Sequence, residues 1–169
     1  FGIGVEAGRT ERVRLLKVVS ESFNNALRAK VTNNGRSIGL LNAFQRFRNI
    51  VRAVDESLRR LQTDYIDLYQ THAPDTATPI DETLRALDDL VRAGKVRYVG
   101  CSNLPAWQVV EAQWTSRDKG LTPFISCQDE YSLVMRDAER ELIPAMQRYG
   151  LGLLPYFPLA SGLLTGKYK

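Results

Sequence analysis

The feature that most constrains the fold is a regular alternation of amphipathic helical segments and apolar, strand-like runs. Apolar side chains recur at helical spacing from Phe47 to Leu61, and the run DYIDLYQ (64–70) follows at once. Further strand-like runs lie at 96–101, 124–128 and 151–156, separated by helical segments at 78–94, 105–115 and 137–149. This order predicts parallel strands joined by right-handed crossovers.

Local signals set the helix boundaries. Thr78 is suited to an N-cap and Pro79 to the first helical position, while Asp81 and Glu82 suit the positive end of the helix dipole. Gly94 is suited to end that helix. Pro144 predicts a kink or break within 137–149, because proline removes an interior hydrogen bond.

The N-terminal part has weaker signals. We expect a helix at about 10–23 and a strand at 26–31, which ends near Lys30. No Gly-x-Gly-x-x-Gly sequence joins a strand to a helix, so the usual dinucleotide-binding fingerprint is missing. An open doubly wound sheet and a closed barrel both fit the alternation.

Polar side chains close the apolar runs, and the last four are spaced by roughly 25 to 31 residues, the size of one strand–helix unit. In either architecture the carboxyl ends of the strands form the active-site edge. The residues are Lys30, His72, Ser102 with Asn103, Gln128 and Tyr156. We therefore expect a shared site, although singly Asn103 could cap the next helix and Gln128 could bind loop backbone.

Composition excludes several classes. The net charge is +4 among 169 residues, and basic residues alternate with acidic ones, unlike a nucleic-acid footprint. No apolar stretch approaches the roughly 20 residues of a membrane span. Cys101 and Cys127 lack metal-ligand spacing and predict buried free thiols in a cytoplasmic protein, with no metal site. Trp107 and Trp114, seven apart, predict packing positions.

Several motifs together are recognisable: DYIDLYQTHAPD (64–75), TPIDETLRALDDLVRAGKVRYVGCSN (78–103), SCQDEYSL (126–133) and ERELIPAMQRYGLGLLPYFPLASGLLTGKY (139–168). They resemble the aldo-keto reductases, in particular the bacterial branch related to potassium-channel β subunits. The resemblance is clear over 50–168. It implies an α/β fold, the (β/α)₈ TIM barrel, and an oxidoreductase that binds NADP(H) without a Rossmann domain.

The resemblance also implies roles for individual residues. His72 matches the histidine that orients the carbonyl, and Lys30 matches the lysine that lowers the pKa of a proton-donating tyrosine. Ser102, Asn103 and Gln128 match the nicotinamide carboxamide site, and Tyr156 matches the aromatic that stacks on the ring. The loop that wraps the cofactor pyrophosphate corresponds to Pro158, Leu159, Ala160, Gly162 and Leu164.

The chain departs from the family pattern at its start and in its length. Phe1 stands where the catalytic tyrosine would align loosely, and the family's aspartate would precede it. A complete barrel needs about 250 residues, so we expect residues 1–169 to be one partial domain with about strands three to seven, a fragment or truncated product. Phe157 replaces the serine of the family's usual YSPL.

Three functions remain open. The resemblance implies an NADP-dependent reductase of small aldehydes or ketones, which could form a homo-oligomer. Phe1 instead motivates a non-catalytic nucleotide-binding or regulatory protein, like a channel β subunit or a degenerate paralogue. A third hypothesis is a barrel enzyme of other chemistry, in which Lys30 forms a Schiff base.

Overall fold

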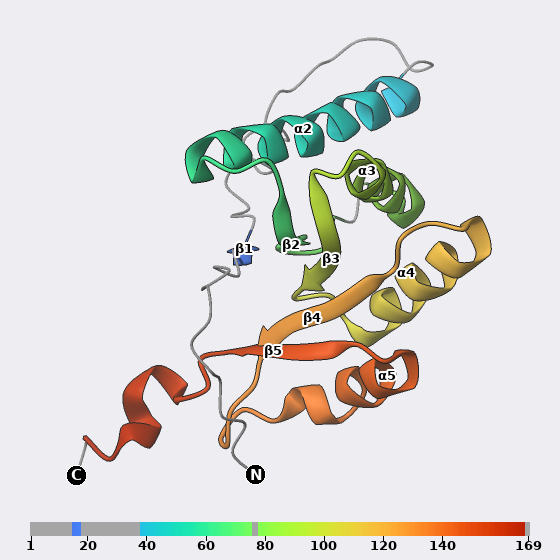
Figure 1. The fold of residues 1–169 in the computed structure, drawn as a ribbon. Helices are drawn as coiled ribbons and strands as arrows, with labels where there is room; N and C mark the ends of the chain where they lie inside the picture. The colour runs from blue at the N-terminus through green and yellow to red at the C-terminus, as the bar shows by residue number, and fades with distance from the viewer. Residues whose placement is uncertain (1–14, 18–37, 76–77, 168–169) are drawn as a thin grey trace, which may run out of the picture.

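A single parallel sheet runs through the molecule. The structure, a computed structural model, describes residues 15–17, 38–75 and 78–167. Consecutive strands are neighbours in the sheet (Figure 1). The strands are β1 (Leu15–Lys17), β2 (Ile66–Gln70), β3 (Val96–Ser102), β4 (Phe124–Glu130) and β5 (Gly152–Tyr156). The parallel alternation predicted from the sequence is confirmed.

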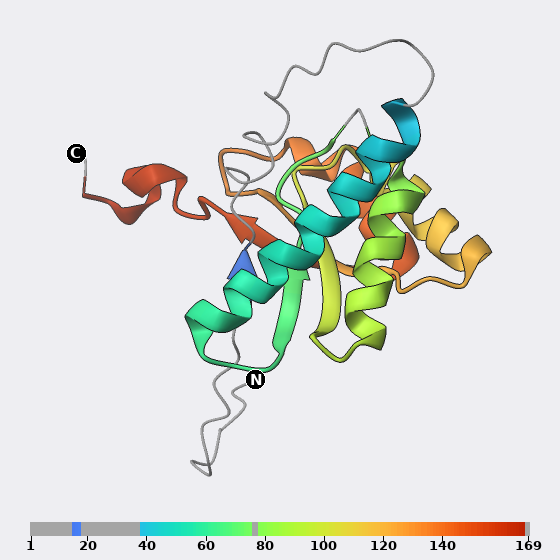
Figure 2. The ribbon, with the colours of Figure 1, turned by 90° about the horizontal axis from the view of Figure 1, so that it is seen from above.

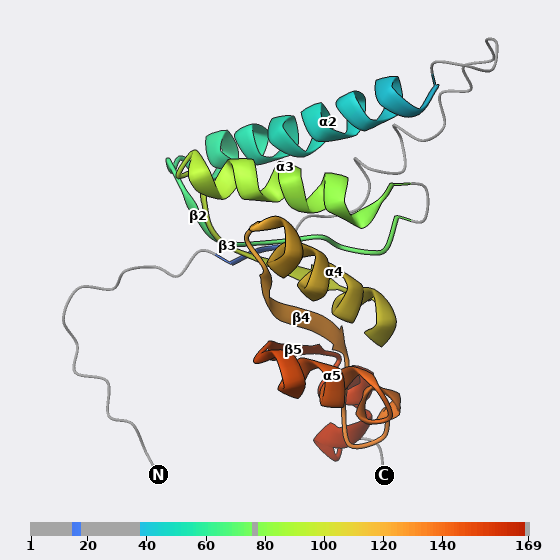
Figure 3. The ribbon, with the colours of Figure 1, turned by 90° about the vertical axis from the view of Figure 1, so that its right-hand side faces the viewer.

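Helices connect the strands and form an outer layer along one side of the sheet (Figures 2 and 3). They are α2 (Ile38–Leu61), α3 (Ile80–Arg92), α4 (Ala106–Lys119) and α5 (Leu142–Tyr149). Two 3₁₀ helices complete the described residues, η1 (Asp137–Glu139) before α5 and η2 (Ala160–Thr165) after β5. Every crossover helix lies on this side. The opposite face of the sheet therefore carries the strand side chains that alternate with those pointing into the core.

The core fills the space between the sheet and the helices. Its fully buried side chains include Val54 of α2, Leu84 and Leu87 of α3, and Val109 of α4. Each buried side chain of this size stabilises the fold by roughly 1.5–3 kcal/mol. The sheet contributes Val99 and the two cysteines, which are free and buried as predicted.

Two buried polar side chains hold the helices to the N-terminal end of β4. The Asp88 carboxylate on α3 accepts hydrogen bonds from the Thr122 backbone N–H (2.9 Å) and hydroxyl (2.7 Å), and pairs with Arg92 at 2.5 Å. Gln113 Nε2 on α4 donates to the Phe124 carbonyl oxygen at 2.7 Å. This end of the sheet is therefore fastened to its helices by specific bonds as well as by packing.

Helix α3 begins close to its predicted start, but the prediction of its capping residue is wrong. The helix begins at Ile80 after Pro79, with no side-chain cap, and the Thr78 hydroxyl donates instead to the Asp75 carboxylate. Asp81 occupies the first turn with Glu82, as predicted. The Asp75 carboxylate thus accepts the hydroxyl proton of the residue that the sequence pattern assigns to the helix cap.

The N-terminal prediction needs a larger correction. Residues 15–17 form β1, paired with β2, and not part of a helix over 10–23. The run VRLLKVV (13–19) carries three valines, which favour a strand over a helix. The predicted strand at 26–31 lies outside the described residues. The helix predicted over 137–149 is divided, but the division lies before Pro144: η1 ends at Glu139, α5 begins at Leu142, and Pro144 lies in the first turn of α5.

The prediction that Trp107 and Trp114 pack in the core is wrong. Both are 62% exposed. The buried stripe of α4 is carried instead by Val109, Ala112, Gln113 and Ser116. Seven-residue spacing does place the two indoles on one helix face, but that face is directed to solvent. Within the described residues no helix is long and apolar enough to cross a membrane.

Candidate functional site

The polar residues predicted at the strand ends lie at one edge of the sheet. Ser102 is the last residue of β3 and pairs in register with Gln128 of β4, and Tyr156 is the last residue of β5. His72 follows β2 by two residues. Since the strands are parallel, their carboxyl ends meet at this edge, and the sequence spacing predicted the meeting correctly.

Asn103 joins these residues through its side chain. Its Nδ2 donates to the His72 carbonyl oxygen at 2.7 Å and to Ser102 Oγ at 3.0 Å. Its Oδ1 accepts a hydrogen bond from the Tyr156 hydroxyl at 2.9 Å. One amide therefore connects the ends of β2, β3 and β5.

The backbone of Asn103 completes the connection. Its N–H donates to the Gln128 carbonyl oxygen at 3.0 Å, and its φ of +58° lies in the left-handed region that asparagine tolerates better than most residues. Helix α4 begins at Ala106 with no side-chain cap. The alternative that Asn103 merely caps this helix is therefore wrong.

Two polar atoms beside this amide have no partner within the described residues. They are His72 Nδ1 and Thr71 Oγ1, both buried. A buried polar atom without a hydrogen bond costs about 1–3 kcal/mol, so a ligand or a water is expected to satisfy it. His72 is one of the residues that the sequence predicts for the shared site, so this unpartnered nitrogen belongs to a predicted site residue.

A second polar row lies one step further into the sheet. Gln70, Gly100 and Ser126 are register partners on neighbouring strands, and all three are buried. A Cβ at Gly100 would collide with Ser126 Oγ and stand 3.0 Å from the Ser126 carbonyl oxygen. Sequence reasoning missed Gln70. Its signal was present, because Gln70 and His72 are two apart in an extended run and share a face.

Burial and carboxylates shape the titration of this edge. Burial raises the pKa of Asp129, although the Glu130 backbone N–H that the carboxylate accepts partly opposes the effect. Burial also raises the pKa of the Tyr156 phenol, with a further contribution from the charges of Asp129 and Glu130. Tyr156 therefore keeps its hydroxyl proton at neutral pH and can donate it to Asn103.

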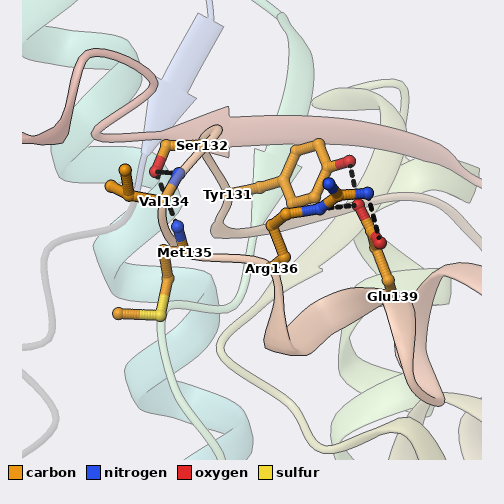
Figure 4. A network of polar contacts seen from close by, with 6 residues as sticks. All are labelled: Tyr131, Ser132, Val134, Met135, Arg136 and Glu139. Atoms are coloured by element: carbon orange, nitrogen blue, oxygen red, sulfur yellow. Dashed lines mark hydrogen bonds and ion pairs between the residues drawn. The ribbon is translucent and has the colours of Figure 1, made fainter. Parts of the chain in front are cut away.

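The loop after β4 is held by two polar clusters (Figure 4). Ser132 Oγ accepts hydrogen bonds from the backbone N–H groups of Val134 (3.3 Å) and Met135 (3.0 Å). The Glu139 carboxylate accepts from the Tyr131 hydroxyl at 2.6 Å and from two Arg136 nitrogens at 2.8 Å each. These bonds fix the chain that leaves the site edge, and sequence reasoning did not assign them.

The segment after β5 turns sharply. Phe157, Ala160 and Ser161 have positive φ, and the backbone N–H of Gly162 and that of Leu164 both donate to the Leu159 carbonyl oxygen. The Phe157 ring packs edge-on against Tyr156, with ring centroids 5.4 Å apart. The segment with Pro158, Leu159, Gly162 and Leu164 thus follows β5 directly in the chain. In Figure 1 it is the red segment between β5 and the C-terminus. The role of these residues at a pyrophosphate stays a prediction.

The predicted catalytic Lys30 lies outside the described residues, as does Phe1. The strand beside β2 is β1, where Lys17 is the register partner of Gln70 at the carboxyl edge of the sheet. Among the residues that the structure describes, no group of three or more His, Cys, Asp or Glu side chains could hold a metal ion.

Sequence comparison identifies the family. The profile described as "Aldo/keto reductase family" matches residues 27–169. This chain belongs to the aldo/keto reductase family. The resemblance found in the motifs is therefore confirmed, and the curled parallel sheet with its outer helices forms part of the expected (β/α)₈ barrel.

Curated relatives cover the same region. An aldo-keto reductase of Fusarium vanettenii is 48% identical over 116 residues, which are 69% of this chain and 31% of that protein. An uncharacterized oxidoreductase of Bacillus subtilis, YrpG, is 46% identical over 118 residues, 70% of this chain and 36% of that protein. An aryl-alcohol dehydrogenase of Pestalotiopsis microspora is 45% identical over 117 residues, 69% of this chain and 30% of that protein. The chain thus spans about a third of these relatives.

Proposed function

We propose that this aldo/keto reductase chain takes part in hydride transfer between NADP(H) and the carbonyl of a small aldehyde or ketone. The observation that carries the proposal is the cluster at the carboxyl edge, where Asn103 bonds to His72, Ser102 and Tyr156. The family and the oxidoreductase names among the relatives support the same reaction class.

We propose that the residues at this edge bind a nicotinamide carboxamide. Ser102 Oγ accepts a hydrogen bond from Asn103, which leaves its own proton to donate. Asn103 Oδ1 accepts one bond from Tyr156 and has a second lone pair for an amide N–H. The Gln128 side chain provides a further donor and acceptor beside Ser102. Tyr156 supplies an aromatic ring for stacking.

When bound, the nicotinamide supplies the hydride, and the protein orients the reactants. Reduction would add the hydride to the carbonyl carbon and a proton to the carbonyl oxygen, which gives an alcohol. Because Phe1 aligns with the family's proton-donating tyrosine, we propose that solvent supplies the proton. We propose that His72 hydrogen-bonds this oxygen, a role for which its unpartnered ring nitrogen is suited. Lys30 would lower the pKa of the proton donor by its positive charge.

An aromatic substrate is the first choice to test, because one relative is named an aryl-alcohol dehydrogenase. We place the reaction in a reducing cytoplasm, where the free thiols of Cys101 and Cys127 persist. No nucleic acid partner is proposed, since the charge is mixed along the chain, and a homo-oligomer remains compatible with the proposal.

The test has two stages on the purified chain. NADPH is titrated calorimetrically, and NADPH oxidation is then followed at 340 nm with benzaldehyde and small aliphatic aldehydes as substrates. We expect saturable binding that His72→Ala leaves nearly unchanged, and turnover that the same substitution lowers by roughly 100-fold. The matched control is Gln113→Met, a neutral change that removes a buried amide at the opposite end of β4.

Each result selects between the functions. Binding with turnover supports the reductase. Binding without turnover favours the non-catalytic nucleotide-binding alternative for this chain. Absence of NADPH binding by the folded chain would contradict the proposed cofactor site.

A further inference from the structure

The Asn103 side chain makes three hydrogen bonds to the protein, to His72, Ser102 and Tyr156. We infer that Asn103 is a positioning residue, whose side-chain amide fixes the Tyr156 ring and the His72 backbone in one frame before any ligand binds. The inference rests on the proposed function, because it assigns the stacking ring and the carbonyl-orienting histidine to one reaction. It adds a role for the Tyr156 hydroxyl, which stacking alone does not use.

The amide orientation follows from its partners. An asparagine amide has two N–H donors and one oxygen with two lone pairs. Both donors of Asn103 are engaged, one by the His72 carbonyl oxygen and one by Ser102 Oγ. A rotation of the amide by 180° would place Oδ1 against the His72 carbonyl oxygen, acceptor facing acceptor, at about the present 2.7 Å. The bond from the Tyr156 hydroxyl is therefore the arrangement that satisfies all three groups.

The amide is itself held by its backbone. The Asn103 N–H donates to the Gln128 carbonyl oxygen at 3.0 Å, and its φ of +58° suits asparagine or glycine. A side chain that is anchored at its backbone and at both amide protons has little freedom left. Asn103 can therefore impose a position on the groups that it bonds.

Asn103 and Phe157 both restrain the Tyr156 side chain. The hydroxyl at the far end of the ring is bonded to Asn103 at 2.9 Å, and Phe157 packs against the ring edge at an interplanar angle of 77°. Restraints at two points of a planar side chain fix its plane. A ring that is already ordered loses less conformational entropy when a second ring stacks on it, and this smaller loss strengthens binding.

Neutral substitutions test the frame. Tyr156→Phe keeps the ring and removes its bond to Asn103, and Asn103→Gly removes the amide while it keeps the left-handed backbone accessible. We expect Tyr156→Phe to weaken NADPH binding by about threefold to tenfold, the effect of one net hydrogen bond. Asn103→Gly should weaken it further, because it also removes the Oδ1 acceptor that we propose for the carboxamide. The double variant should lose less affinity than the sum of the two single effects, because both substitutions remove the same bond.

Two matched controls separate positioning from general destabilisation. Gln113→Met removes a buried amide that also bonds a backbone carbonyl, but at the opposite end of β4. Tyr131→Phe removes a tyrosine hydroxyl that also bonds a side chain, in the loop beyond the site. Both should lower the melting temperature and leave the NADPH dissociation constant within about twofold of wild type. Additive effects of the two site substitutions, or an unchanged constant in Tyr156→Phe, would overturn the inference.

A readout without nucleotide separates this inference from the proposed function. In ¹H–¹⁵N spectra of the free chain, the Asn103 side-chain protons should exchange slowly with solvent. The Ala73 amide, which shares a peptide group with the His72 carbonyl, should shift in both Tyr156→Phe and Asn103→Gly. If wild type binds no NADPH but these shifts appear, the proposed function fails and the frame stands. If the Ala73 signal does not move in either variant, the frame is overturned.

Discussion

Gln113 and Asn103 are amide side chains that bind backbone carbonyls at opposite ends of the sheet, and their surroundings differ. Gln113 is buried and donates to Phe124 in an environment of packed apolar residues. Asn103 is half-buried, and His72 beside it has a buried ring nitrogen without a partner in the described chain. Ser116 Oγ, one turn from Gln113 on α4, is also buried without a partner in the described chain. The comparison therefore teaches that the two ends differ in what their amides join, because Gln113 joins one helix to one strand and Asn103 joins the ends of three strands.

Two carboxylates also differ between the two ends of the sheet. Burial acts to raise the pKa of Asp88, but hydrogen bonds from Thr122 and Arg92 outweigh it and lower the pKa below the ordinary value. Burial raises the pKa of Asp129 at the site end, and only the Glu130 backbone N–H opposes it. Ionisation of Asp88 therefore favours the folded state, whereas ionisation of Asp129 disfavours it.

The largest effect is expected at Asp88. Asp88→Ala leaves Thr122 and Arg92 without their acceptor, and should lower the free energy of unfolding by about 3 kcal/mol at pH 7. Because the folded-state pKa is lowered, this contribution is present above the ordinary value of 3.8 and is lost as the pH falls through the folded-state pKa. Urea unfolding at pH 7 and pH 3 measures both. If Asp88→Ala also lowered the NADPH affinity at pH 7, the proposed difference between the two ends of the sheet would be contradicted.

A smaller effect is expected at Gly100, between the two ends. Gly100→Ala places a methyl group against Ser126 Oγ and the Ser126 carbonyl, and should cost about 2 kcal/mol of stability. Adding Ser126→Gly should recover part of this loss, since it removes one of the two obstructions. Thermal unfolding of the single and double variants measures the recovery. An unchanged stability in Gly100→Ala would show that the site-end strands separate easily.

Asp129→Asn should stabilise the protein at neutral pH. The raised pKa means that the folded state holds the proton more tightly than the unfolded chain. The stabilising contribution is therefore present at low pH and is lost as the pH rises through the folded-state pKa. The variant should exceed wild type in unfolding free energy at pH 7, and the difference should disappear below the ordinary pKa of 3.8. A destabilised variant at pH 7 would contradict this assignment.

The smallest effect is expected at Phe157. Its ring packs against Tyr156 but is largely exposed, so Phe157→Ser should lower stability by only about 0.5 kcal/mol. The effect on the site is more informative, because Tyr156 loses one of its two restraints. Chemical denaturation measures the free energy of unfolding. NADPH titration measures the affinity, which should fall if the contact of Phe157 with Tyr156 helps to hold the ring. A loss of stability like that expected for Asp88→Ala would place Phe157 in the structural core.

The sequence predicted the part of the molecule in which periodicity and strand ends are regular. The apolar runs that end near His72, Ser102, Gln128 and Tyr156 are parallel strands, and their polar ends meet. The spacing of apolar residues alone could not show which face of α4 is buried. The exposure of Trp107 contradicted the prediction made from that spacing. The sequence also could not predict the hydrogen bonds of Asn103, because they join residues from three strands that are distant in the chain.

The most direct test of the central claim is chemical-shift mapping of NADPH on the ¹⁵N-labelled chain. The account predicts that the largest shifts fall on His72, Ser102, Asn103, Gln128 and Tyr156, at the carboxyl ends of the strands. Thr122 and Phe124, at the other end of β4, should keep their signals in place. Shifts centred on Thr122 and Phe124, or no shifts at a saturating NADPH concentration, would contradict it.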